Sequence, residues 1–224
     1  MKMLRSSILC LAVVLVAAPL LRAQDLSKYR HFTIGMTLNR VLERTDQKVA
    51  DVKMIHGRPA LIQELAWWPP NVPGASYQAD AVEQILLSFY NGELYRISVT
   101  YDRTSTEGLT AEDLVKSISA KYGPATNLML ELDSAKIDSY DARQRTLASW
   151  EDAQYSFNLV RSSFTDGLGL TIYSKRVNAA AGLAIVEAVK LEEQEAPKRE
   201  ADRQKKQSDD LETARQKNRK VFRP

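Results

Sequence analysis

The stretch of sequence that decides the fold is Val82-Glu83-Gln84-Ile85-Leu86-Leu87-Ser88-Phe89-Tyr90-Asn91-Gly92-Glu93-Leu94-Tyr95-Arg96-Ile97-Ser98-Val99-Thr100-Tyr101. Two runs rich in aliphatic, β-branched and aromatic residues flank Asn91-Gly92, a dipeptide that favours a tight turn between antiparallel strands. We therefore predict a β-hairpin with strands at Val82–Tyr90 and Glu93–Tyr101.

Both faces of this predicted hairpin are apolar. The turn predicts three cross-strand pairs, Phe89 with Leu94, Leu87 with Arg96, and Leu86 with Ile97. One face then contains Val82, Leu86, Tyr90, Tyr95, Ile97, Val99 and Tyr101, and the other contains Ile85, Leu87, Phe89 and Leu94. Helices cover only one face of such a sheet. The second face either packs against the rest of the chain, including the helix after residue 176, or is a partly exposed surface for a protein partner.

Two similar segments indicate an internal repeat. Gly35-Met36-Thr37 and Gly108-Leu109-Thr110 each open an amphipathic stretch, and the same offset relates Val41 to Leu114, Leu42 to Val115, and Lys48 to Lys121. Each Thr is placed to cap a helix, and Asp113 completes a capping box in the second copy.

The apolar spacing defines both helices. The second has a stripe at Leu114, Ile118 and Tyr122 and ends at Gly123-Pro124, where a helix cannot continue. The first has its stripe at Leu38, Val41, Leu42 and Thr45, with no such stop.

Further strands follow each helix. In the first copy they are Val49–Ile55 and Ala60–Trp68, around a turn at residues 56–59. In the second copy, apolar residues alternate at Tyr155, Phe157 and Leu159 and again at Leu168, Leu170 and Ile172. We expect an α+β fold of two tandem helix-plus-antiparallel-meander repeats, at residues 24–103 and 104–176.

Residues 177–224 form a charged tail. Ala179–Leu191 favours a helix that packs on the second repeat or frays from it. Beyond Pro197 charges of both signs dominate without a sustained heptad, so we expect a partly helical, partly disordered segment. Its tip is basic through Arg215, Lys217, Arg219, Lys220 and Arg223. These cations are either a solvated end or a weak contact with anionic envelope polymers or lipid head groups.

Residues 1–23 have the pattern of a secretory signal peptide. Lys2 and Arg5 precede an apolar run at Ile8–Leu21, with cleavage expected after Ala23 or Ala18. The run is too short for a permanent anchor, so no transmembrane span is expected after cleavage. Cys10 lacks the context of a lipoprotein signal, and it is the only cysteine. We expect a periplasmic or secreted protein that does not depend on disulfides.

The charge balance argues against nucleic-acid binding. The formal net charge is +3, and residues 1–23 contain three basic residues and no acidic one, so the remainder is neutral. No global basic field remains to attract a polyanion.

Signals of catalysis are sparse. His31 and His56 are not at metal-ligand spacing, and the chain has no nucleophile elbow or phosphate-binding glycine loop. A cluster of acidic residues at Glu131, Asp133, Asp138 and Asp141 does not fit a calcium loop. We expect no catalytic residue, no metal and no cofactor.

Trp67-Trp68-Pro69-Pro70 ends a predicted strand. Neighbouring residues on a strand point to opposite faces, so one Trp is expected in the core and the other as an exposed anchor for a partner.

Together, the Gly-Met-Thr helix openings, the hairpin and the duplication resemble an exported α/β repeat superfamily. It includes the β-lactamase inhibitor proteins and the SmpA/OmlA (BamE-like) outer-membrane assembly lipoproteins. The resemblance covers roughly residues 30–176 and departs from both groups, because the chain has neither a cysteine pair nor a lipobox. It implies a fold and a tendency to bind other proteins.

The sequence thus predicts an exported, non-enzymatic protein-binding module whose partner is another envelope or secreted protein. It would use an open sheet surface and the aromatic loop Trp67–Gly74, with Trp67, Trp68, Tyr90 and Tyr95 as candidate partner-binding residues. The alternatives are an envelope scaffold that makes contact through its basic tail and an enzyme of unknown type.

Overall fold

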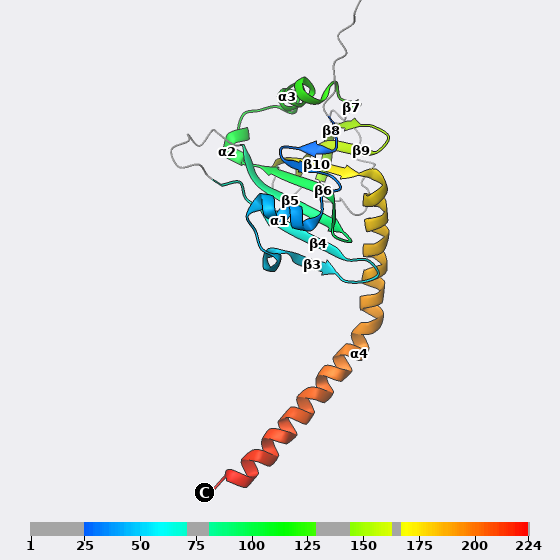
Figure 1. Ribbon diagram of the computed structural model, residues 1–224. Helices are drawn as coiled ribbons and strands as arrows, with labels where there is room; N and C mark the ends of the chain where they lie inside the picture. The colour runs from blue at the N-terminus through cyan, green and yellow to red at the C-terminus, as the bar shows by residue number, and fades with distance from the viewer. Residues whose placement is uncertain (1–24, 71–80, 129–143, 163–166, 224) are drawn as a thin grey trace, which may run out of the picture.

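The computed structural model describes residues 25–70, 81–128, 144–162 and 167–223 (Figure 1). It has an α+β fold, as predicted, built on one eight-stranded antiparallel sheet in the order β3-β4-β5-β6-β10-β9-β8-β7. The strands are β3 Lys53–His56, β4 Ile62–Trp67, β5 Val82–Tyr90, β6 Glu93–Tyr101, β7 Asn127–Leu128, β8 Gln144–Glu151, β9 Tyr155–Ser162 and β10 Leu168–Ser174.

Each half of this sheet is a meander that follows a helix. Helix α1 (Leu38–Thr45) precedes β3 to β6, and α3 (Ala111–Tyr122) precedes β7 to β10. The two meanders join at the pairing of β6 with β10, which makes the sheet continuous. Duplication of one ancestral unit remains a prediction.

The central hairpin, β5–β6, begins and ends as predicted. Its turn residues Asn91 and Gly92 have φ of 51° and 82°, the positive values that this tight turn requires. The predicted pair of Phe89 with Leu94 is also correct.

Two of the predicted pairs in this hairpin are wrong, because an irregularity shifts the register between Ser88 and Phe89. Leu87 pairs with Ile97 and Leu86 with Ser98. The extra residue on β6 changes the expected faces, so that Ile97 and Val99 join the buried cluster that contains Ile85, Leu87, Phe89 and Leu94.

The two helix starts differ. Thr110 caps α3 through a capping box with Asp113, whose pKa is lowered by hydrogen bonds from the backbone and side chain of Thr110. Gly123 ends α3 as predicted. Thr37 precedes α1 but makes no side-chain capping bond, which corrects that part of the prediction. The predicted strand Val49–Ile55 also begins differently, as a 3-10 turn at Val49–Asp51 before β3.

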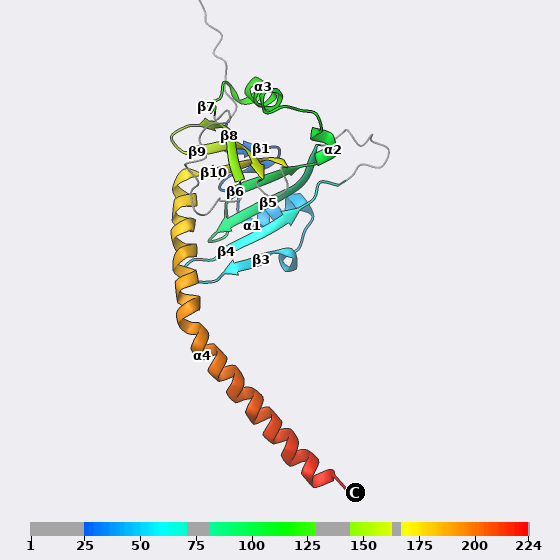
Figure 2. The ribbon, with the colours of Figure 1, turned by 180° about the vertical axis from the view of Figure 1, so that it is seen from behind.

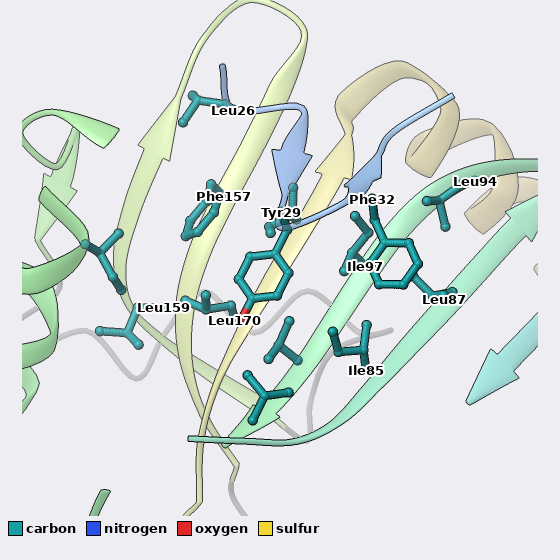
Figure 3. Packing of buried hydrophobic residues seen from close by; sticks show 14 of the residues in the cluster. Leu26, Tyr29, Phe32, Ile85, Leu87, Leu94, Ile97, Phe157, Leu159 and Leu170 are labelled. Atoms are coloured by element: carbon teal, nitrogen blue, oxygen red, sulfur yellow. The ribbon is translucent and has the colours of Figure 1, made fainter. Parts of the chain in front are cut away.

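A short N-terminal hairpin, β1 (Lys28–Tyr29) and β2 (Phe32–Thr33), covers the middle of the sheet. In Figure 3, Tyr29 lies near Phe157 and Leu170 of the second half, and Phe32 lies near Ile97 and Leu87 of the first half. The Tyr122 hydroxyl donates to the carbonyl of Lys28 over 3.2 Å, which ties α3 to this hairpin. Burial raises the pKa of Tyr122 to about 12. Both halves of the chain therefore share one core.

The tail is a single helix, α4, at Lys175–Val221, with a short α2 (Arg103–Thr106) the remaining helix of the described segments. Its first part lies against the sheet and the rest extends away from it (Figure 2). The predicted helix after residue 176 is confirmed, and it continues through Val221, beyond the expected segment Ala179–Leu191 and over the part expected to be disordered. The sequence there is rich in Ala, Glu, Lys, Arg and Gln, which favour helix, and Pro197 interrupts only one backbone bond.

Candidate protein-binding surface

The face of the sheet opposite the main core, here called the rear face, has three regions. Next to the Asn91-Gly92 turn it is covered by α4, across its middle it is polar, and at the far end of β4 it carries Trp68.

In the covered region, α4 packs on β4 and β6 of the first half, while its first residues contact the second half. Ile62 and Tyr95 form a second buried cluster with Ala181 and Ile185 of α4. Of the two alternatives for the second face of the hairpin, this region therefore follows the one in which the helix after residue 176 covers that face.

A hydrogen-bond contact and an ion pair hold α4 against the turn between β3 and β4. The Nδ1 atom of His56 lies 3.0 Å from Oε1 of Glu192, and both carboxylate oxygens of Glu195 accept hydrogen bonds from Nη2 of Arg58, at 3.2 and 2.8 Å. The hydrogen bond and charge of Arg58 lower the pKa of Glu195. The start of α4 is thus fixed to the body by apolar packing and by charge.

The middle of the rear face is a network of short polar side chains. Ser149 donates to Asn158 over 2.7 Å, and Asn158 donates in turn to Ser156 over 2.9 Å. The hydroxyl of Thr171 donates to Gln144 over 3.3 Å. Ser149, Ser156, Asn158 and Thr171 are buried, and hydrogen bonding offsets the cost of removing them from water.

Glu151 links this network to the start of α4. Its carboxylate accepts a 2.8 Å bond from Lys175 Nζ and a 3.0 Å bond from the hydroxyl of Ser156. These bonds, that of Lys175 foremost, hold the pKa of Glu151 below its usual range.

The lowered pKa of Glu151 predicts an acid-dependent loss of stability. A carboxylate with a depressed pKa in the folded state stabilises the fold above its unfolded pKa, and this stabilisation is lost as pH falls through the folded pKa. Glu151→Gln should therefore cost less than about 1 kcal/mol at neutral pH, because the pair is partly exposed, and nothing at acid pH. Urea unfolding at both pH values measures the difference. Glu193→Gln on α4 is the control, and an equal response of the two variants contradicts the assignment.

The paired tryptophans divide as the sequence predicts. The ring of Trp67 packs edge-on against Phe32, with ring centroids 5.6 Å apart, and joins the main core. Trp68 follows β4 by one residue and is 58% exposed. Alternation along the strand directs it toward the rear face.

Trp68 has apolar neighbours on that face. Ala66 and Leu86 pair across β4 and β5, and both are half-buried. They share the face of Ile62, beyond the part that α4 covers. We call Trp68, Ala66 and Leu86 the Trp68 patch.

The other candidate anchors differ. Tyr95 is only 4% exposed beneath α4, so its expected role as an exposed anchor is wrong; its large apolar side chain serves the packing of the helix. Tyr90 is half-buried against the same cluster. Trp67 is a core residue, so Trp68 is the one well-exposed side chain among the four candidate partner-binding residues.

A second apolar surface was not identified from the sequence. Leu183 and Val186 lie on the side of α4 away from Ala181 and Ile185, Val189 lies at its flank, and the three are 75%, 52% and 42% exposed. Apart from Glu187, the run from Ala179 to Val189 is apolar, which was the signal in the sequence. A helix with this pattern is usually covered on both sides.

The remaining candidates show no chemical site. His31 stacks near Phe32 and Trp67, and burial, together with Arg44 and Arg30, lowers its pKa. In the parts of the chain that the structure describes, no three His, Cys, Asp or Glu residues gather to hold a metal. The acidic cluster at residues 131–141, the part of the predicted aromatic loop after residue 70 and the predicted signal peptide at residues 1–23 lie outside the described residues.

In comparisons with protein-family models, curated protein sequences and solved structures, no match to the chain was found. Within the described ranges, no helix is both long and apolar enough to cross a bilayer.

Proposed function

We propose that the chain is an exported, non-enzymatic module that binds another protein in the envelope or outside the cell. The observation that supports this most directly is Trp68, which is 58% exposed while its neighbour Trp67 is fixed in the core. Trp residues dominate the binding energy of many interfaces because a large apolar surface leaves water when they are covered.

The surroundings of Trp68 support the same proposal. Trp67 anchors the end of β4, so Trp68, the next residue, is held close to a fixed point of the core. Ala66 and Leu86 extend the apolar area, and the half-buried Glu64 and Ser98 on the same face offer polar groups beside it. Interfaces commonly combine an apolar centre with a polar rim.

Export is supported by the leader-like residues 1–23, and a protein partner by the resemblance to exported inhibitor and assembly proteins. Both remain proposals about where the protein acts and what it meets.

The experiment is site-specific photo-crosslinking in the exporting cell. Benzoylphenylalanine replaces Trp68 in one variant and Met54 in a matched control, because Met54 is 65% exposed on the edge strand β3. We expect one stoichiometric protein adduct from position 68 and none from position 54. Trp68→Ala should then weaken binding to the captured protein at least about 30-fold without lowering the melting temperature.

A third crosslinker, at Val186 on the outer side of α4, separates the two apolar surfaces. An adduct from position 186 alone would assign the interface to α4 instead. Equal adducts from positions 68 and 54, or a large loss of thermal stability in Trp68→Ala, would contradict the proposal.

A further inference from the structure

The far end of α4 is strongly basic. Residues 213–223 contain Arg215, Lys217, Arg219, Lys220 and Arg223 and no acidic residue. Every side chain in this segment is exposed. Earlier in the helix, Glu187, Glu192, Glu193 and Glu195 surround a single Lys190, whereas the first two residues of α4 are basic. The tip is therefore the stretch of α4 in which the most basic residues follow one another without an acidic residue.

Apolar side chains accompany these cations. Val221 and Phe222 end the helix and are 68% and 76% exposed. An aromatic residue beside several cations is typical of segments that bind the interface of an anionic membrane, where the ring enters the head-group region and the cations pair with phosphate.

The middle of the exposed helix has a different character. Between Lys198 and Asp210, basic and acidic residues alternate and surround the helix on all sides. That part has no apolar face on which to lie along a membrane. Contact is thus restricted to the tip.

We infer that the tip of α4, residues 213–223, binds an anionic phospholipid surface, and that α4 is the spacer between this surface and the body. This inference is independent of the protein-binding surface proposed above, because it uses another part of the chain. From Ala196 to Val221 the helix spans about 40 Å, so the body stands well clear of the lipid.

The test is co-sedimentation of the chain from Gln24 onward with vesicles of phosphatidylcholine alone or with about one-third phosphatidylglycerol. The tip variant replaces Arg215, Lys217, Arg219 and Lys220 by Gln. The matched control replaces Lys198, Arg203, Lys205 and Lys206 by Gln, which removes the same charge from the same helix. Circular dichroism verifies that both variants keep the helix.

We expect binding to the anionic vesicles only, with a partition coefficient at least about 100-fold lower in the tip variant and less than about tenfold lower in the control. Val221→Ser with Phe222→Ser should weaken vesicle binding and leave binding to soluble polyglutamate unchanged.

Absence of binding by the unmodified chain would overturn the inference, as would equal losses in the tip variant and the control. Unchanged vesicle binding in the Val221→Ser and Phe222→Ser variant would also overturn the assignment to lipid, because charge alone would then explain the contact.

Discussion

Replacing Gly169 by Ala should destabilise the fold by about 3 kcal/mol or more, because the added carbon has no room between the two halves of the sheet. Gly169 lies in β10, and a Cβ at this position would collide with the carbonyl oxygen of Val99 in β6. The obstacle is backbone, which cannot rotate away like a side chain. Relief requires β6 and β10 to separate where they join the two meanders.

Gly182→Ala is the matched control for Gly169→Ala. A Cβ at Gly182 meets no atom within 4 Å, and the position is inside α4. Ala should there stabilise the protein by about 0.5–1 kcal/mol, because it loses less backbone entropy than Gly in a helix. Urea unfolding of both variants measures the contrast. An unchanged midpoint for Gly169→Ala would contradict the close approach of β6 and β10.

The second large effect concerns Trp150, whose side chain is fully buried in β8. Its ring packs edge-on against Phe157, with centroids 5.9 Å apart, and its Nε1 donates to the carbonyl of Gly123 over 2.8 Å. Trp150→Ala should cost about 3–5 kcal/mol through the cavity that it leaves. Thermal unfolding with a fixed protein concentration measures the loss.

Trp150→Phe divides that cost into its parts. It retains most of the apolar volume but leaves the Gly123 carbonyl without the indole donor, for an intermediate loss of about 1–3 kcal/mol. Trp68→Ala serves as the exposed comparison and should change stability by less than about 0.5 kcal/mol. Equal losses at positions 150 and 68 would show that the burial assigned to Trp150 is wrong.

The elements predicted best from the sequence are those with a strong local signal. Asn91-Gly92 fixes a turn by its positive φ angles, and Thr110 with Asp113 begins a helix that Gly123 ends. Each signal acts within a few residues and needs no tertiary partner.

The pairing errors in the hairpin have a different cause. An irregular register between Ser88 and Phe89 accommodates one more residue on β6, at Tyr95, and directs Tyr95 toward α4. No turn rule predicts this, because the partner that favours it, Ile185, is far away in the sequence.

Strand β8 had no prediction because its sequence, Gln144–Glu151, has no regular alternation. A register shift between Thr146 and Ala148 lets two neighbouring residues, Leu147 and Ala148, both join the core. Ser149 then points into the buried polar network, and Trp150 points back into the core. The length of α4 was missed for a related reason. Its charged part was interpreted as too polar for order, although helix propensity and spaced ion pairs such as Arg203–Glu200 favour it.

For the candidate surface, strand alternation was sufficient to separate Trp67 from Trp68, but it did not identify which Trp was buried. The N-terminal hairpin decides this by placing Phe32 against Trp67. Tyr95 was misassigned because its cover, α4, comes from the other end of the chain.

The join between β6 and β10 also governs how the chain reaches its fold. Val99 and Leu170 are neighbours in the sheet, yet most of the second meander is synthesised between them. Strand pairs that are far apart in the sequence form late. The conformational entropy of the long intervening segment must be lost before the pairing can stabilise the fold. As the chain is synthesised from its N-terminus, β6 is therefore a bare edge strand until β10 is made. During that interval the first half is the part most exposed to aggregation, and the arrival of residues 168–188 ends the risk by pairing β6 and covering Tyr95.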